Sequence, residues 1–404
     1  MNKFKKIVLS FGVILMLAGT AGFAATKYLD DSRRLTPIVY ANSAMLLELW
    51  DSYKLNNIEP GSNRTLDKSQ NNITTSEGES YTMLRSVWMD DKDTFDKSWE
   101  FTKSNLQRPD DKLLSWKFGQ RSDGTYGVLT EVGGNNTASD ADVDTALSLL
   151  MAYSRWNQTS YLYQAHEMIN SIWEEQVVMV NNKPVLTAND LEQFSQENVV
   201  VNPSYFSPYS FKLFSKVDPK HDWMGLVDNS YAILNDLSRN PLGSSYSNGL
   251  PPNWISMNRQ TGAYIPTVSP NLDTNYGYDA MRIPFRLALD YSWYKDPRAK
   301  EVMSNFVFLK QEWERDKDLE AVYSHEGKVV GDYEVPAMYG GAIGYFNVME
   351  PDLADDVYEQ KLQTLYSPDK QQWKIPLSYF DDNWAWFGIA LSQDELPNLA
   401  EINN

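Results

Sequence analysis

The chain has 404 residues, with 36 basic and 54 acidic side chains and no cysteine. Its formal charge of -18 repels polyanions, which argues against nucleic acid and uronate polymers as partners and favours a neutral or cationic substrate. The lack of cysteine excludes disulfides, thiolate metal sites and a cysteine nucleophile. The length suffices for an enzyme with one large core or two smaller ones.

The first predicted element is an export segment at residues 1–26. Three lysines precede an apolar stretch at residues 7–19, and small residues follow it. A cleaved signal peptide and a short uncleaved membrane anchor both fit this pattern. We therefore expect an extracytoplasmic protein that is either secreted or anchored to the membrane by this segment.

Helical periodicity predicts about eleven helices in the rest of the chain. They follow one another in pairs, without alternation of strand and helix, which favours an all-α packing of helical hairpins. Helical pattern resumes after each of the long polar connections at 54–75, 108–134, 179–203 and 240–274, so we expect one domain over residues 27–404. The predicted helices cover residues 41–53, 77–88, 94–106, 141–156, 160–177, 223–237, 282–294, 297–315, 338–348, 353–366 and 383–391.

Aromatic residues make up 13% of the chain, including 13 Trp and 24 Tyr. Indole and phenol rings stack on the apolar faces of sugars, so this composition suits a neutral polysaccharide, although an aromatic-rich core would explain it equally well. The three histidines, His166, His221 and His325, lack the spacing of metal ligands. We expect no catalytic metal and no other cofactor.

The first acidic motif contains Ser76, Glu77 and Glu79. Ser76 and Glu79 have the spacing of a helix capping box, which places Glu77 in the first helical turn. There the helix dipole favours the ionised carboxylate, whereas a general acid needs a raised pKa. Burial and a neighbouring carboxylate can raise that pKa, and the sequence leaves the competition open.

The second motif places aspartates at positions 140, 142 and 144. A calcium-binding loop beginning at Asp140 would need glycine and glutamate where Thr145 and Met151 stand, so we reject that site. The pattern instead predicts Ser139 as a helix N-cap with Asp142 three residues later. Asp140 is then left without a structural role.

The third motif contains Tyr278, Asp279, Arg282 and Pro284. Because proline is tolerated only in the first turn of a helix, Pro284 places Asp279 just before a helix start. Arg282 is then close enough to pair with Asp279. Such a pair keeps an aspartate ionised, as a general base requires, but it is equally ordinary as a surface salt bridge.

Together these motifs resemble glycoside hydrolase family 8, whose members include endo-β-1,4-glucanases, chitosanases, licheninases and xylan-acting enzymes. The most specific match is the segment from Ala138 to Trp156, where Thr145 stands in place of the usual Ile or Met. The resemblance implies an (α/α)6 barrel of about twelve helices in two concentric rings.

The resemblance also implies the roles of three acids. Glu77 would be the proton donor, Asp279 the base that activates water, and Asp140 a residue that binds and distorts the sugar at the cleavage point. The implied mechanism inverts the anomeric carbon, with two carboxyl groups roughly 6.5 to 9.5 Å apart. The residues implied to bind substrate or position the water are Trp116, Tyr205, Tyr278 and Arg282.

The retained Asp279 favours a glucanase over relatives whose base lies elsewhere. The expected activity is therefore that of an endo-1,4-β-glucanase, in degradation or in exopolysaccharide biosynthesis. A chitosanase, licheninase or xylan-acting enzyme stays open, as does a non-catalytic glycan-binding protein. We expect a monomer whose partner is a neutral polysaccharide or oligosaccharide.

Overall fold

A computed structural model describes residues 44–267 and 272–400 of the chain. Residues 44–48 are helical and belong to a first unit, and the described residues from Leu49 onward form a second, compact unit. The predicted export segment at 1–26 lies outside the described residues. In the two described ranges, no helix is both long and apolar enough to cross a membrane.

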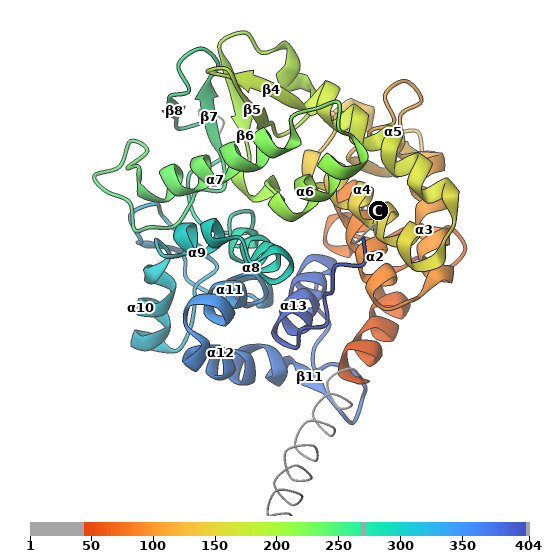
Figure 1. Ribbon diagram of the computed structural model, residues 1–404. Coiled ribbons are helices and arrows are strands. Elements are labelled where there is room, and N and C mark those ends of the chain that lie inside the picture. The colour runs from red at the N-terminus through yellow and green to blue at the C-terminus, as the bar shows by residue number, and fades with distance from the viewer. Residues whose placement is uncertain (1–43, 268–271, 401–404) are drawn as a thin grey trace, which may run out of the picture. The chain divides into compact units, whose positions relative to one another are not determined.

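Six helices of the second unit form a closed inner ring (Figure 1). Each contacts the next in chain order, and the last contacts the first. The inner helices are α2 (Ser76–Trp88), α4 (Ser139–Trp156), α6 (Pro208–Val217), α8 (Arg282–Tyr294), α11 (Pro336–Met349) and α13 (Tyr379–Ser392).

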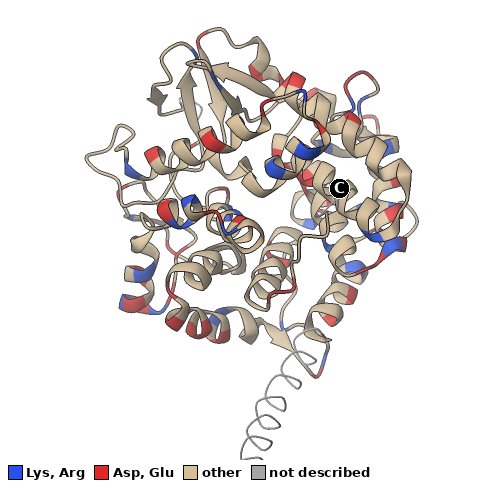
Figure 2. Cartoon of the chain, viewed as in Figure 1, with Lys and Arg blue, Asp and Glu red and all other residues tan. Residues whose placement is uncertain are grey.

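An outer layer of helices alternates with the inner ring along the chain. It comprises helical residues 49–57, α3 (Lys92–Asn105), α5 (Thr159–Gln176), α7 (Trp223–Arg239), α9 (Pro297–Met303) with α10 (Val307–Asp316), and α12 (Pro351–Val357). Inner helices are buried almost throughout, and α11 carries no charged side chain, as Figure 2 shows. The predicted (α/α)6 barrel is confirmed.

Glycines of α11 allow its neighbours to approach unusually closely. A Cβ at Gly340 would lie 2.0 Å from the carbonyl oxygen of Trp384 on α13. A Cβ at Gly341 would lie 1.9 Å from the carbonyl oxygen of Met281, immediately before α8. Side chains at these positions are therefore excluded by backbone atoms, which cannot move aside as a flexible side chain can.

Three helix predictions differ from the structure. The short helix α6 was not predicted, because ten residues that begin at Pro208 are at the length where a helix and a buried strand are hard to tell apart by pattern. The helix predicted at 297–315 is two helices, α9 and α10. In the range predicted as one helix at 353–366, the α-helix α12 ends at Val357. A π turn (Tyr358–Leu362) and a 3-10 turn (Gln363–Leu365) follow it.

The long polar connections carry short antiparallel strands rather than only loops. One sheet is β1 (Thr74–Thr75), β2 (Lys117–Gln120) and β3 (Tyr126–Val128), and another is β6 (Asn198–Val201), β7 (Ile255–Asn258) and β8 (Tyr264–Ile265). Strands this short give too few residues for a period-two pattern. Strand pairs are β4 (Val177–Val180) with β5 (Lys183–Leu186), β9 (Val322–Tyr323) with β10 (Val329–Gly331), and β11 (Tyr366–Ser367) with β12 (Gln372–Trp373); 3-10 turns cover Lys68–Gln70, Thr130–Val132, Asp190–Phe194 and Pro203–Tyr205.

The capping box predicted for α2 is wrong. Thr75 is the N-cap of α2, and its hydroxyl accepts from the Gly78 backbone N–H at 3.0 Å. The carboxylate of Glu79 instead accepts from the Thr65 backbone N–H at 2.6 Å and from the Ser98 hydroxyl at 2.5 Å. Glu79 on the inner helix α2 thus bonds both the connection that precedes α2 and the outer helix α3.

The capping box predicted for α4 is also wrong, because its two side chains bond segments outside the helix. The N-cap is Ala138, which makes no side-chain cap, and the Ser139 hydroxyl donates to the carbonyl oxygen of Thr187 at 2.6 Å. Asp142 accepts from the Leu114 backbone N–H at 2.9 Å and from the Gln176 amide at 2.6 Å. Tertiary contacts to connecting segments have replaced the local caps.

The substitution Glu79→Gln is expected to flatten the dependence of stability on pH. Burial raises the pKa of Glu79 from 4.5 to about 7, so the folded state holds a proton that the unfolded chain releases. Its contribution is fully present below pH 4.5 and is lost as the pH rises through 7, by about 3 kcal/mol in total. Urea unfolding at pH 4.5 and pH 8 measures the difference, with Glu100→Gln on the exposed side of α3 as the control. If the parent, Glu79→Gln and Glu100→Gln showed the same dependence of unfolding free energy on pH, Glu79 would not be the group responsible.

Candidate active site

Three predicted acids converge at the N-terminal ends of the inner helices. Glu77 lies in the first turn of α2 and Asp140 in the first turn of α4, while Asp279 lies three residues before α8 begins at Arg282. The chain between Gly277 and Arg282 turns tightly, because Met281 N–H donates to Gly277 O and Arg282 N–H donates to Asp279 O. The position of Asp279 just outside the helix agrees with the sequence prediction.

Arg282 joins the three carboxylates. Its Nη1 donates to Glu77 Oε2 and to Asp140 Oδ2, each at 2.9 Å, and its Nη2 donates to Asp279 Oδ1 at 2.5 Å. The arginine side chain is only 1% exposed, whereas those of Glu77 and Asp279 are 21% and 28% exposed. One buried cation therefore contacts two partly exposed carboxyl groups and the buried carboxyl group of Asp140.

The environment of Glu77 shifts its pKa upward. Burial raises its pKa above the ordinary value, and the attraction of Arg282 only partly offsets this. The Tyr379 hydroxyl, at the start of α13, donates to Glu77 Oε1 at 2.8 Å. Burial is the largest of these effects on the Glu77 pKa, and the charge of Asp279 adds to it.

Asp279 is surrounded by donors. Oδ1 accepts from the Asn202 amide at 3.0 Å as well as from Arg282, and Oδ2 accepts from Trp254 Nε1 at 2.9 Å. Asn253, next to Trp254, accepts from the backbone N–H groups of Gly277 and Ala280 and fixes the turn that carries Asp279. These contacts suit an ionised carboxylate, which only accepts hydrogen bonds.

Asp140 is the buried member of the trio, with a side chain only 3% exposed. Burial raises its pKa to about 7, Arg282 opposes the shift, and Glu77 and Asp144 add to it. Its Oδ1 accepts from the Ala141 backbone N–H at 2.9 Å. Asp144, one turn further along α4, forms a bidentate ion pair with Arg286 at 2.9 and 2.8 Å. A second buried Asp–Arg pair therefore follows the Asp140–Arg282 pair along α4 and α8.

The remaining predicted residues border this cluster. The Tyr205 ring lies 5.3 Å from the Arg282 guanidinium, and Tyr278 is 39% exposed, with its hydroxyl 3.2 Å from that of Tyr333. Trp116 is half-buried, and its carbonyl oxygen accepts from Ser76, the residue before Glu77. All seven predicted site residues therefore lie in or beside one region.

Arg282 is the cation that all three acids contact. The described parts of the chain contain no group of three or more His, Asp or Glu side chains arranged to hold a metal ion. His221 stacks on Trp173, and His325 bonds the carbonyl oxygen of Asn240.

A family model described as glycosyl hydrolases family 8 matches residues 34–370. The chain belongs to this family. Endoglucanase A of Acetivibrio thermocellus is 30% identical over 305 residues, which cover 72% of this chain and 59% of that protein. The chain spans about half to three fifths of the length of the first such relatives.

Solved structures of family 8 proteins share the barrel. The structure described as endo-1,4-D-glucanase of Vibrio fischeri ES114 has a TM-score of 0.71 at 23% identity, covering 86% of this chain and 94% of that one. The β-1,3-1,4-glucanase of Paenibacillus sp. X4 has a TM-score of 0.72 at 22% identity, covering 88% and 92%. Likenesses at this level of identity establish the fold of the chain, not its substrate.

Sequence reasoning missed several residues that contact the acids of this family 8 site. Trp254 and Tyr379 lie far along the chain from the residues they bond, and no local pattern marks either one. Asn202 had a signal, since it directly precedes the Pro-Ser-Tyr stretch that led to Tyr205. Thr145, which departs from the family pattern, is a fully buried packing residue of α4.

Proposed function

We propose that the chain is an inverting, endo-acting glycoside hydrolase that cleaves β-1,4-glucan, with Glu77 as general acid and Asp279 as general base. The contrast between the two carboxyl groups carries this proposal. Burial raises the pKa of Glu77, which accepts from Arg282 and Tyr379, whereas Asp279 accepts from three donors, Arg282, Asn202 and Trp254. Two carboxyl groups whose environments differ in this way can divide the acid and base roles.

The reaction is a single displacement. Glu77 donates its proton to the glycosidic oxygen as the bond to the anomeric carbon breaks, and Asp279 accepts a proton from the water that attacks the opposite face of that carbon. Arg282 bonds both carboxyl groups through different nitrogens, and the sugar and the water are proposed to bind between them. Asp140 and Tyr205 are proposed to hold the sugar and the water, respectively.

The substrate proposal rests on the relatives that are named endoglucanases and on the exposed Tyr278 ring beside the base. A named β-1,3-1,4-glucanase with the same fold makes a mixed-linkage glucan the main alternative. Hydrolysis of hydroxyethyl-cellulose, mixed-linkage glucan, xylan and chitosan, followed by product sizing and polarimetry, tests both proposals. Cleavage of xylan or chitosan alone would overturn the substrate, and retention of anomeric configuration would overturn the mechanism.

A non-catalytic glycan-binding role makes a different prediction. The purified chain would bind these polymers without releasing reducing ends. An intact acid, base and intervening arginine argue against this outcome, because binding alone does not require three carboxylates around one guanidinium.

Trp254→Phe is expected to lower kcat about tenfold with little change in KM. The substitution retains an aromatic ring beside Tyr205 but removes the donor to Asp279 Oδ2, a hydrogen bond to a charged group. Steady-state kinetics on a cello-oligosaccharide measure the effect, with Trp293→Phe, which bonds a backbone carbonyl far from the site, as the control. A rise in KM at unchanged kcat would show that Trp254 binds sugar and does not position the base.

We also propose that residues 1–26 export the chain, because the lysine-led apolar segment has the composition of an export signal. Fractionation of cells that express the full chain, followed by N-terminal sequencing, separates three outcomes. A shortened chain in the medium indicates a cleaved signal, a full-length chain in the membrane indicates an anchor, and a full-length chain in the cytosol contradicts export.

A further inference from the structure

We propose that a cavity beside the sheet β1–β3 is a second carbohydrate-binding site, which holds the polymer outside the catalytic cluster. The identity of its polymer rests on the proposed function, but the site itself does not. The cavity has a volume of about 460 Å³ and lies where the connection after residues 49–57, the end of α3 and strands β2 and β3 meet. Its walls include Glu59, Ser62, Arg64, Asn105, Phe118 and Tyr126.

The Tyr126 ring is the feature that suits a sugar. It is 56% exposed, yet it is held in place by the Arg64 guanidinium 5.1 Å from its centroid and by the Phe118 ring at 6.4 Å. Arg64 is itself fixed by two bonds to Glu59, at 2.7 and 3.1 Å, and by one to the carbonyl oxygen of Asn72 at 2.7 Å. An exposed aromatic ring that already has contacts loses less entropy when a pyranose stacks on it than a free ring would.

The polar walls of the cavity can bond sugar hydroxyls. Hydrogen bonds from Arg64 lower the pKa of Glu59, whose half-buried carboxylate therefore stays ionised and accepts hydrogen bonds. The Ser62 hydroxyl donates to this carboxylate at 2.5 Å, and the Asn105 amide donates to the Phe101 carbonyl oxygen at 2.9 Å, leaving its own carbonyl oxygen as an acceptor. An apolar ring beside a few fixed polar groups is the usual composition of a sugar site.

The register of the sheet separates this cavity from the catalytic cluster. Trp116, whose carbonyl oxygen bonds Ser76, directly precedes β2, whereas Tyr126 pairs with Gln120 at the far end of β2. Four residues of strand span roughly 14 Å. The Tyr126 cavity and the Trp116 end of β2 are therefore distinct positions, and a long glucan can contact both.

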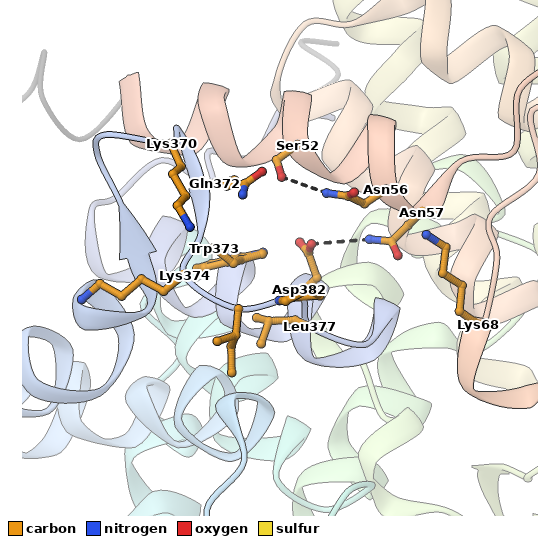
Figure 3. Close-up of a pocket in the computed structure, with 12 residues that line it drawn as sticks. Ser52, Asn56, Asn57, Lys68, Lys370, Gln372, Trp373, Lys374, Leu377 and Asp382 are labelled. Carbon is orange, nitrogen blue, oxygen red and sulfur yellow. Dashed lines mark hydrogen bonds between the residues drawn. The ribbon is translucent and has the colours of Figure 1, made fainter.

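The cavity in Figure 3 has no exposed aromatic ring beside its polar groups. It has a volume of about 280 Å³, and Lys68, Lys370 and Lys374 lie around it. Its one aromatic residue, Trp373, is 4% exposed and offers no free ring face. The exposed ring therefore distinguishes the Tyr126 cavity as the sugar site.

Affinity electrophoresis of the full chain tests the proposal. All variants carry Glu77→Gln so that the polymer stays intact, and gels contain hydroxyethyl-cellulose, mixed-linkage glucan, xylan or chitosan. Tyr126→Ala is expected to weaken polymer binding roughly 2- to 12-fold, as the loss of one ring contact implies, and Asn105→Ala is expected to weaken it as well.

The matched control is Tyr163→Ala, which removes a ring 66% exposed on α5. The proposal is overturned if Tyr126→Ala and Asn105→Ala both bind every polymer as the parent does, or if Tyr163→Ala loses as much binding as Tyr126→Ala. Failure of the proposed function is a separate result, namely no release of reducing ends by the chain with Glu77 intact.

Discussion

Replacing Glu77 with glutamine is expected to lower kcat on a β-glucan by roughly 10²- to 10⁴-fold, the usual contribution of a positioned general acid. Glutamine has nearly the same shape and can keep the contacts to Arg282 and Tyr379, so the loss measures the missing proton. An aryl cellobioside with an acidic phenol as leaving group needs little protonation, and the same variant should lose much less activity on it.

The pH profile supplies an independent check on the same residue. The acid must be protonated to act, so kcat/KM of the parent falls as the pH rises through the raised pKa of Glu77. The alkaline limb should disappear in Glu77→Gln. Glu79→Gln is the matched control, because Glu79 lies in the same helical turn but bonds Thr65 and Ser98 outside the site. An unchanged rate for Glu77→Gln would remove Glu77 from the mechanism.

Arg282→Met is expected to abolish measurable hydrolysis and to lower the free energy of unfolding by about 3 to 5 kcal/mol at pH 8. The variant leaves Glu77, Asp140 and Asp279 without the cation that all three contact. Repulsion among them raises their tendency to bind protons, so the stability deficit should shrink as the pH falls. Urea unfolding at pH 5 and pH 8 measures both effects.

Arg298→Met provides the comparison for Arg282→Met. Arg298 also contacts carboxylates, those of Asp228 and Asp296, but its side chain is 33% exposed. An exposed ion pair contributes roughly 0 to 1 kcal/mol. Two results would contradict the role of burial in the cluster. One is a loss of unfolding free energy in Arg298→Met as large as that in Arg282→Met, and the other is a loss in Arg282→Met that grows as the pH falls.

The sequence was sufficient for the features that depend on local pattern. Pro284 placed the start of α8, and from it the position of Asp279 and its pairing with Arg282 followed. The sequence could not show that Glu77 and Asp140, more than 60 residues apart, share one guanidinium nitrogen of Arg282. That contact depends on closure of the inner ring, which no local pattern encodes.

The same limit explains the two wrong capping boxes. Glu79 and Asp142 have the spacing of capping residues, but each accepts from a backbone N–H in another segment, that of Thr65 or Leu114. A local cap and a tertiary bond use the same carboxylate, and the sequence alone does not rank them. Trp254 was missed for a related reason, since its loop reaches Asp279 only in the folded barrel.

The close contact of α11 with the segment before α8 has a consequence for mutagenesis. A methyl group at Gly341 would lie 1.9 Å from the carbonyl oxygen of Met281, whose neighbour is Arg282. Any side chain there displaces the backbone that carries the arginine, although α11 contributes none of the proposed catalytic groups. A random-mutation screen for loss of hydrolysis should therefore recover Gly341 alongside the carboxylates, and second-site changes of the Met281 side chain should not restore activity, because the carbonyl oxygen remains.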